Sequence, residues 1–149
     1  MSVRENIALD IVQDLQGITN PAPVIVSRNP IKLTDLSIAQ FPAIIVQTTN
    51  EQRTDETSTN TFRFGQIEYT ITGYVRADSS ATTVNNNIDT QRNNIIEAIS
   101  EKLEEDRTRN SNAMNSYVTA VQTDDGTQFP IGTAVITFVV DYKYTRGTL

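Results

Sequence analysis

Carboxylates are the residues of this sequence that could do chemistry, and they gather in three places. Residues 124–126 read Asp-Asp-Gly, but the alternating acids and the distant bidentate glutamate of a calcium loop are missing, so we expect a hairpin turn. Four acids within residues 101–106 end a predicted helix, where we expect them to face solvent or a basic partner. Glu68 and Asp141 are the one pair that a glycosidase-type mechanism could use, and we expect no such activity.

Other catalytic and cofactor chemistry lacks its usual residues. The chain has no cysteine and no histidine, which removes disulfides, thiolate metal sites, thiol catalysis and the commonest general base. Its six glycines are scattered singly, so the sequence holds no glycine-rich phosphate loop. The sequence therefore predicts a protein that is not an enzyme and that holds no cofactor and no metal ion.

Length and composition predict one soluble domain over residues 1–149. A chain with 38% hydrophobic and 20% charged residues can bury one core, and it has no membrane-spanning run. Residues 1–15 mix acids among apolar positions and lack the zones of a secretory signal, so we expect folding in a cytoplasm. A net charge of −6 argues against a protein that grips nucleic acid, because that affinity comes from Lys and Arg.

The apolar spacing predicts two helices, one from Ser2 to Gly17 and one over residues 82–106. In both, apolar residues recur at spacings of three and four, and Ser2 with Glu5 has the form of a capping box. The apolar stripe of the second helix consists of Val84, Ile88, Ile95, Ile99 and Leu103.

Alternating or continuous apolar runs predict five strands, over residues 24–26, 41–46, 62–76, 117–123 and 132–144. The last is apolar on both faces near its middle, so we expect it to be a central strand. The alternation of the third slips by one at Gly65-Gln66, which predicts a glycine β-bulge there. Residues 27–40 are apolar enough that we expect them to pack as an ordered excursion.

The order helix, strand, strand, strand, helix, strand, strand leaves one helix between two groups of strands. It predicts an α+β fold, a two-layer sandwich with an antiparallel or mixed sheet of about five strands and both helices on one face. Tyr69, Tyr142 and Tyr144 share the apolar faces of their strands and are predicted to lie in the core. Tyr74 points the other way and is predicted at the surface or in an interface.

A polar segment, residues 50–60, joins two long strands and holds Arg53, Asp55 and Glu56. As a flexible hairpin tip it needs no further role. The flanking strands are long enough to carry it away from the body, and the threonine-rich outer face of residues 68–76 suits contact with another subunit. We therefore expect an arm that reaches a neighbouring subunit.

Five segments in this order carry a resemblance to a known family: LQGIT at 15–19, PIKLTDL at 30–36 with FPAIIV at 41–46, GQIEYTITGYV at 65–75, the helix of 84–105, and GTAVITFVVDYKY at 132–144. Over nearly the whole chain the layout resembles the tail terminator (tail-completion) proteins of long-tailed bacteriophages. Those proteins share a small α+β fold with an N-terminal helix, a sheet with a long hairpin, a second helix and two closing strands.

The resemblance implies a structural virion protein that forms a hexameric ring, caps the tail tube, ends its polymerisation and joins the tail to the head-side neck. Implied partners are other copies of this chain, the tail tube protein, a neck connector or stopper and, in a contractile tail, the sheath. DNA would pass through the lumen without specific binding, and no membrane is involved. The candidate contact residues are Arg53, Asp55, Glu56, Tyr74, Arg76 and Arg146.

Two other functions stay open. Another neck component, such as a head-tail connector or stopper, would share the acidic character, the small size and the absence of catalysis, and only its partners would distinguish it. A regulatory α+β domain that binds a small molecule would need a pocket with converging polar groups, and the sequence shows no such cluster.

Overall fold

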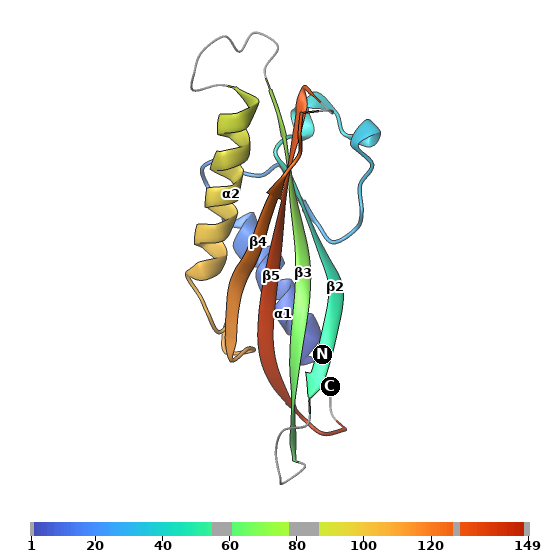
Figure 1. The fold of residues 1–149 in the computed structure, drawn as a ribbon, viewed down its shortest axis with the longest axis vertical. Helices are drawn as coiled ribbons and strands as arrows, with labels where there is room; N and C mark the ends of the chain where they lie inside the picture. The colour runs from blue at the N-terminus through green and yellow to red at the C-terminus, as the bar shows by residue number, and fades with distance from the viewer. Residues whose placement is uncertain (1, 55–60, 78–86, 127–128, 148–149) are drawn as a thin grey trace.

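The computed structural model describes residues 2–54, 61–77, 87–126 and 129–147. They form an α+β sandwich of two layers, in which a five-stranded mixed sheet with the order β1-β2-β3-β5-β4 carries two helices on one face. Figure 1 shows that the molecule is long in the direction of its strands. The fold class and the order of the elements are those that the sequence predicts.

The helices α1 (Val3–Gln16) and α2 (Ile88–Glu104) each turn one apolar stripe toward the sheet. Ser2 caps α1 by accepting a 3.2 Å hydrogen bond from the backbone N–H of Glu5, while the Glu5 carboxylate pairs with Arg28. Residues 82–86 of the predicted second helix, Val84 included, lie outside the described residues. The buried stripe residues are Ile7, Ala8, Ile11 and Leu15 in α1 and Ile95, Ile99 and Leu103 in α2.

The strands are β1 (Ile25–Ser27), β2 (Ala43–Thr54), β3 (Phe62–Arg76), β4 (Asn115–Thr123) and β5 (Ile131–Thr145). β1 pairs with β2 in parallel, and the other neighbouring pairs are antiparallel. β5 lies between β3 and β4, which confirms the prediction of a central strand.

The core lies between the helices and the sheet. Even-numbered residues of β5 and odd-numbered residues of β3 point toward the helices, and Phe138 and Tyr69 are almost wholly buried there. Burial of each such side chain stabilises the fold by roughly 1.5–3 kcal/mol. The predicted core positions of Tyr69, Tyr142 and Tyr144 are confirmed, since all three side chains are buried.

The β-bulge lies in β2 rather than in β3. The register of β2 against β3 shifts between Thr48 and Asn50, whereas β3 pairs with β5 without interruption. The predicted slip at Gly65-Gln66 is therefore wrong. Gly65 has a packing role instead, because a Cβ at this position would lie 2.4 Å from Cε1 of Tyr142.

Two segments differ from the predicted loops. β2 continues to Thr54, well beyond the predicted end at Val46, because the polar residues 50–54 pair with β3. In the excursion over residues 27–40 the chain forms two short 3-10 helices, η1 (Leu33–Asp35) and η2 (Ile38–Gln40). That excursion packs only in part, since the side chain of Ile38 is 71% exposed.

Candidate functional site

The ends of three strands continue past the helices at one end of the molecule (Figure 1). We call this end of the sheet the arm and define it as residues 50–54 of β2, 62–68 of β3 and 139–145 of β5, which pair side by side. The base of the arm, with Ile67 and Val140, still belongs to the core. The predicted long hairpin is thus present as paired strands, and its contact with a neighbouring subunit stays a prediction. Residues 55–60, with the candidate contacts Asp55 and Glu56, lie outside the described residues.

Glu51 ties the arm to the body on the helix side of the sheet. Its carboxylate accepts the hydroxyl of Tyr142 and lies 3.1 Å both from Nη2 of Arg53 and from Nε of Arg4, in the first turn of α1. Burial alone would raise the pKa of Glu51, but the hydrogen bonds from Tyr142 and Arg53 hold this pKa below its ordinary value. Glu51 therefore stays charged at neutral pH and keeps all three partners.

Aromatic rings and cations pack against both faces of the arm. Tyr142 and Tyr144 stack with ring centroids 5.8 Å apart, and the Arg53 guanidinium lies 5.4 Å from the Tyr144 centroid. On the opposite face the Lys143 ammonium lies 5.2 Å from the ring centroid of Phe62. Arg53, predicted at a flexible tip, is thus a strand residue with fixed partners, and the arm is a packed element.

The sheet face that no helix covers, which we call the outer face, is uncharged at its centre. Its central side chains are Gln47 of β2, Thr70 and Thr72 of β3, and Thr133, Val135 and Thr137 of β5. Tyr74 and Arg76 lie on this face at the end opposite the arm, and burial raises the pKa of Tyr74. A half-exposed face of threonine and valine suits contact with another β-surface.

Glu68 and Asp141, the pair considered for acid and base catalysis, both lie on the outer face of the arm. Asp141 accepts a 2.9 Å hydrogen bond from the Gln66 amide, and the Thr49 hydroxyl donates to the backbone carbonyl of Glu68. The depression beside them, about 400 Å³ in volume, has Asp141 as the sole acidic residue among its described lining residues. The depression therefore offers no second carboxylate to Asp141.

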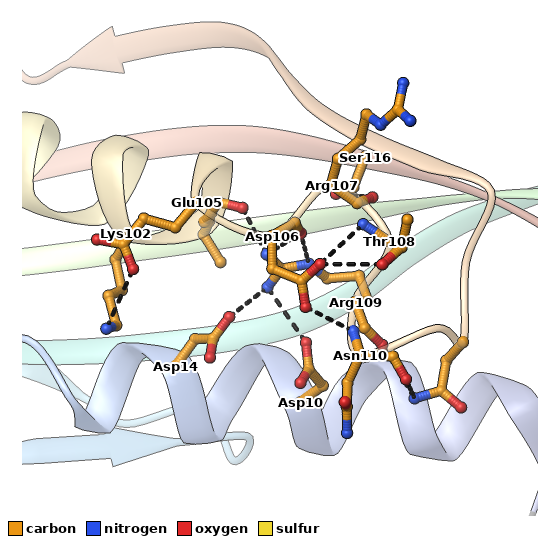
Figure 2. Close-up of polar contacts among 12 residues, drawn as sticks. Asp10, Asp14, Lys102, Glu105, Asp106, Arg107, Thr108, Arg109, Asn110 and Ser116 are labelled. Atoms are coloured by element: carbon orange, nitrogen blue, oxygen red, sulfur yellow. Dashed lines mark hydrogen bonds and ion pairs between the residues drawn. The ribbon is translucent and has the colours of Figure 1, made fainter.

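A buried arginine joins α1 to the loop after α2, as Figure 2 shows. The Arg109 side chain is fully buried, with Nη1 2.7 Å from an Asp14 oxygen and 3.3 Å from an Asp10 oxygen. Its other N–H groups donate to the backbone carbonyls of Leu103 and Asp106. A buried charge that is paired and hydrogen-bonded in this way is a structural support and is closed to substrates.

The loop that positions Arg109 is shaped by Asp106. The Asp106 carboxylate accepts the backbone N–H of Asn110 at 2.7 Å and of Thr108 at 3.1 Å. These hydrogen bonds hold the pKa of Asp106 below its ordinary value, and the bond from the backbone N–H of Asn110 has the largest effect. Three consecutive residues, Arg109 to Ser111, have φ between 49° and 65°, a left-handed backbone that non-glycine residues adopt rarely.

The predicted contact residues fall into two groups. Arg53 lies in the arm, and Arg146 follows β5 there, where its backbone N–H donates to the Thr61 carbonyl at 2.9 Å. Tyr74 and Arg76 lie at the other end of the outer face. These residues thus lie on two separate parts of the surface, and their role as contacts stays a prediction.

Within residues 2–54, 61–77, 87–126 and 129–147, no group of three or more acidic side chains is arranged to hold a metal ion. None of the helices in these ranges is both long and apolar enough to cross a membrane.

The sequence matches no family model and no curated protein. The fold is similar to a chain in the solved structure of the virion of a native gene transfer agent (GTA) particle, with 11% sequence identity and a TM-score of 0.44, over 96% of this chain and 92% of that chain. A likeness this distant carries no argument about function, which has to come from the surfaces described above.

Proposed function

We propose that this chain is a structural virion protein, without enzymatic activity, that forms a ring on the end of a phage tail tube, ends tube growth and joins the tail to the neck. The arm is the observation that carries the proposal. It is a packed, three-stranded projection whose shape is fixed by Glu51, Tyr142 and Arg53 before any partner binds. A prearranged contact surface avoids much of the entropy cost of ordering a loop on binding.

The element order gives a second support. The observed order α-β-β-β-α-β-β, with a long hairpin between β2 and β3, is the one implied by the resemblance to tail terminators.

Two properties fit a ring through which DNA passes. The arm and the centre of the outer face lie in different parts of the sheet, so contacts between copies can be head-to-tail and can close by rotation. The net charge of −6 disfavours adhesion of DNA.

The test is to mix the purified protein with tail tubes of the phage that encodes it and to image the tube ends by electron microscopy. We expect a ring of density at one end and a fixed tube length. Bare tubes together with binding to isolated heads or portals would replace the proposal with the neck-connector alternative. Binding to neither would leave the proposal without support and favour a ligand-binding domain.

A matched pair of variants tests the segment that joins β2 to β3 at the end of the arm. Replacing residues 55–60 by a short turn should abolish capping and leave the thermal midpoint unchanged, because the network around Glu51 is retained. Inserting two glycines after Gly126, in the turn that follows β4, is the control and should cap normally. Normal capping by the shortened arm would refute the role given to it.

A further inference from the structure

Two strand edges of the sheet have no neighbouring strand in the described part of the chain. β4 pairs with β5 alone, so its other edge is open over all nine residues, Asn115–Thr123. β1 covers β2 only at Ala43 to Ile45, so the outer edge of β2 is open from Val46 to Thr54. The two open edges lie on opposite sides of the sheet.

The β4 edge has the composition of an interface. Its sequence, NSYVTAVQT, contains no charged residue and no proline. Tyr117 and Val121 are 36% and 47% exposed, and Met114, just before the strand, is 41% exposed. Edge strands that stay in water are usually protected by charges, by proline or by being short. A nine-residue edge without charge or proline is suited to pair with another strand.

The two open edges have their bulges at the same height along the strands, and each edge is bent there. Each carries one bulge, between Thr48 and Asn50 in β2 and between Val118 and Ala120 in β4. Both bulges adjoin the same cross-strand row of the sheet, which consists of Thr48, Tyr69, Phe138 and Val118. The bulge threonines also bond alike, since Thr49 and Thr119 each donate a hydroxyl to a carbonyl of the adjacent strand, at 3.2 and 3.3 Å. A bulge bends an edge and so favours partner strands that follow the same bend.

The strand directions complete the match. Within one copy β2 and β4 run antiparallel to each other, because three antiparallel steps separate them. If neighbouring copies are related by rotation about an axis parallel to the strands, every copy keeps the same strand directions. β4 of one copy would then meet β2 of the next as an antiparallel pair, with the two bulges at the same height along the axis. Contacts without an axial step close into a ring instead of climbing as a helix.

We infer that the outer edge of β4 in one copy pairs with the outer edge of β2, residues 46–54, in the next copy. The sheet then runs continuously from subunit to subunit. The ring geometry rests on the proposed function, whereas the match of the two edges rests on the single chain.

The absence of cysteine makes a cross-linking test direct. Ala120 of β4 and Gln47 of β2 lie on the outer face and in the same row, through Thr137 and Thr70. With a short bis-maleimide reagent, Ala120→Cys alone and Gln47→Cys alone should stay single chains on a denaturing gel. Their mixture should give covalent pairs, and the double variant should give a ladder of higher species. Cross-linking of Ala120→Cys with itself would overturn the inference in favour of a two-fold β4–β4 contact.

A charge on the edge gives an independent readout. Val121→Lys should abolish association, measured as solution mass and as the fraction of capped tubes, without changing the thermal midpoint. Leu9→Lys, at a position of α1 that is 42% exposed, is the matched control and should associate normally. A Val121→Lys protein that associates as well as wild type overturns the edge contact.

These outcomes separate the inference from the proposed function. Capped tubes without the mixed cross-link would refute the edge pairing and keep the capping function. Bare tubes with the mixed cross-link in concentrated solution would refute the capping function and keep the edge pairing.

Discussion

Arg109 is the largest fully buried side chain among the described residues, and Asp10 and Asp14 of α1 hold its charge. Removal of one partner from a buried pair leaves the other without compensation. We predict that Arg109→Met lowers the free energy of unfolding by about 3 kcal/mol, measured by urea denaturation. The loss lies at the lower end for a buried pair because the Asp14 carboxylate, left without its partner, is in contact with water. Arg107→Met, at an exposed position, should change it by less than about 0.5 kcal/mol. Equal midpoints for the two variants would contradict a structural role for the charge.

Asp106 makes stability depend on pH. Hydrogen bonds hold its pKa in the folded state below the ordinary value of 3.8, so its carboxylate stabilises the fold above that pH. We predict that Asp106→Asn is less stable than wild type at pH 7 and that the difference closes as the pH falls below 3.8, through the folded-state pKa. Denaturant titrations at several pH values measure it, and a difference that persists at the lowest pH would contradict the assignment.

Asp10 provides a control of opposite sign. Burial, and then repulsion from Asp14, raise the pKa of Asp10, so its charged form is disfavoured in the folded protein. Asp10→Asn should therefore be at least as stable as wild type at pH 7, measured in the same titrations, because Asp14 still pairs with Arg109 at 2.7 Å in this variant.

At the scale of elements, the arm depends on a glycine. A Cβ at residue 65 would lie 2.4 Å from Cε1 and 2.7 Å from Cζ of the Tyr142 ring, which is fully buried. Gly65→Ala should cost about 1–3 kcal/mol through overpacking, seen as a lower thermal midpoint. Gly73→Ala, on the same strand and face, meets Cγ1 of Ile95 at 3.2 Å and should cost less. The reverse order would contradict the packing role of Gly65.

Periodic or continuous apolar residues predicted both helices and all five strands, because the burial of a helix or a strand leaves such a pattern in the sequence. The polar end of β2 was missed for the same reason. Residues 50–54 are held by pairing with β3 rather than by burial, and their composition is that of a loop. The bulge was misplaced because Gly65, which looked like a bulge glycine, is needed to accommodate Tyr142.

The polar supports of the candidate site could not be predicted from the chain. Arg109 reaches Asp14 across 95 positions of sequence, and Tyr142 reaches Glu51 across 91. Neither pair leaves a local pattern. The acids at positions 10 and 14 of one helix face, and the Asp106–Thr108 turn, were the available signals for the Arg109 loop.

At the scale of the whole molecule, both helices and the sheet share one core cluster centred on β3 and β5. We predict a single unfolding transition and a loss of about 3–5 kcal/mol in Phe138→Ala, since this side chain is fully buried within that cluster. Far-UV circular dichroism would follow the helices. The near-UV signal would follow the packing of all five tyrosines, two of which lie in the arm, because the chain has no tryptophan. Two separate transitions would contradict unfolding as one unit.

Both ends of the described chain lie beside the arm. α1 begins there, where Arg4 pairs with Glu51, and β5 ends there, where Arg146 bonds to Thr61 (Figure 1). A purification tag or fluorescent fusion on either terminus would therefore crowd the arm, the contact surface on which the proposed function rests. The turn at Gly126 is at the other end of the sheet, and an added Cβ there would meet no atom within 4 Å. Labels for imaging the protein in particles belong at that turn.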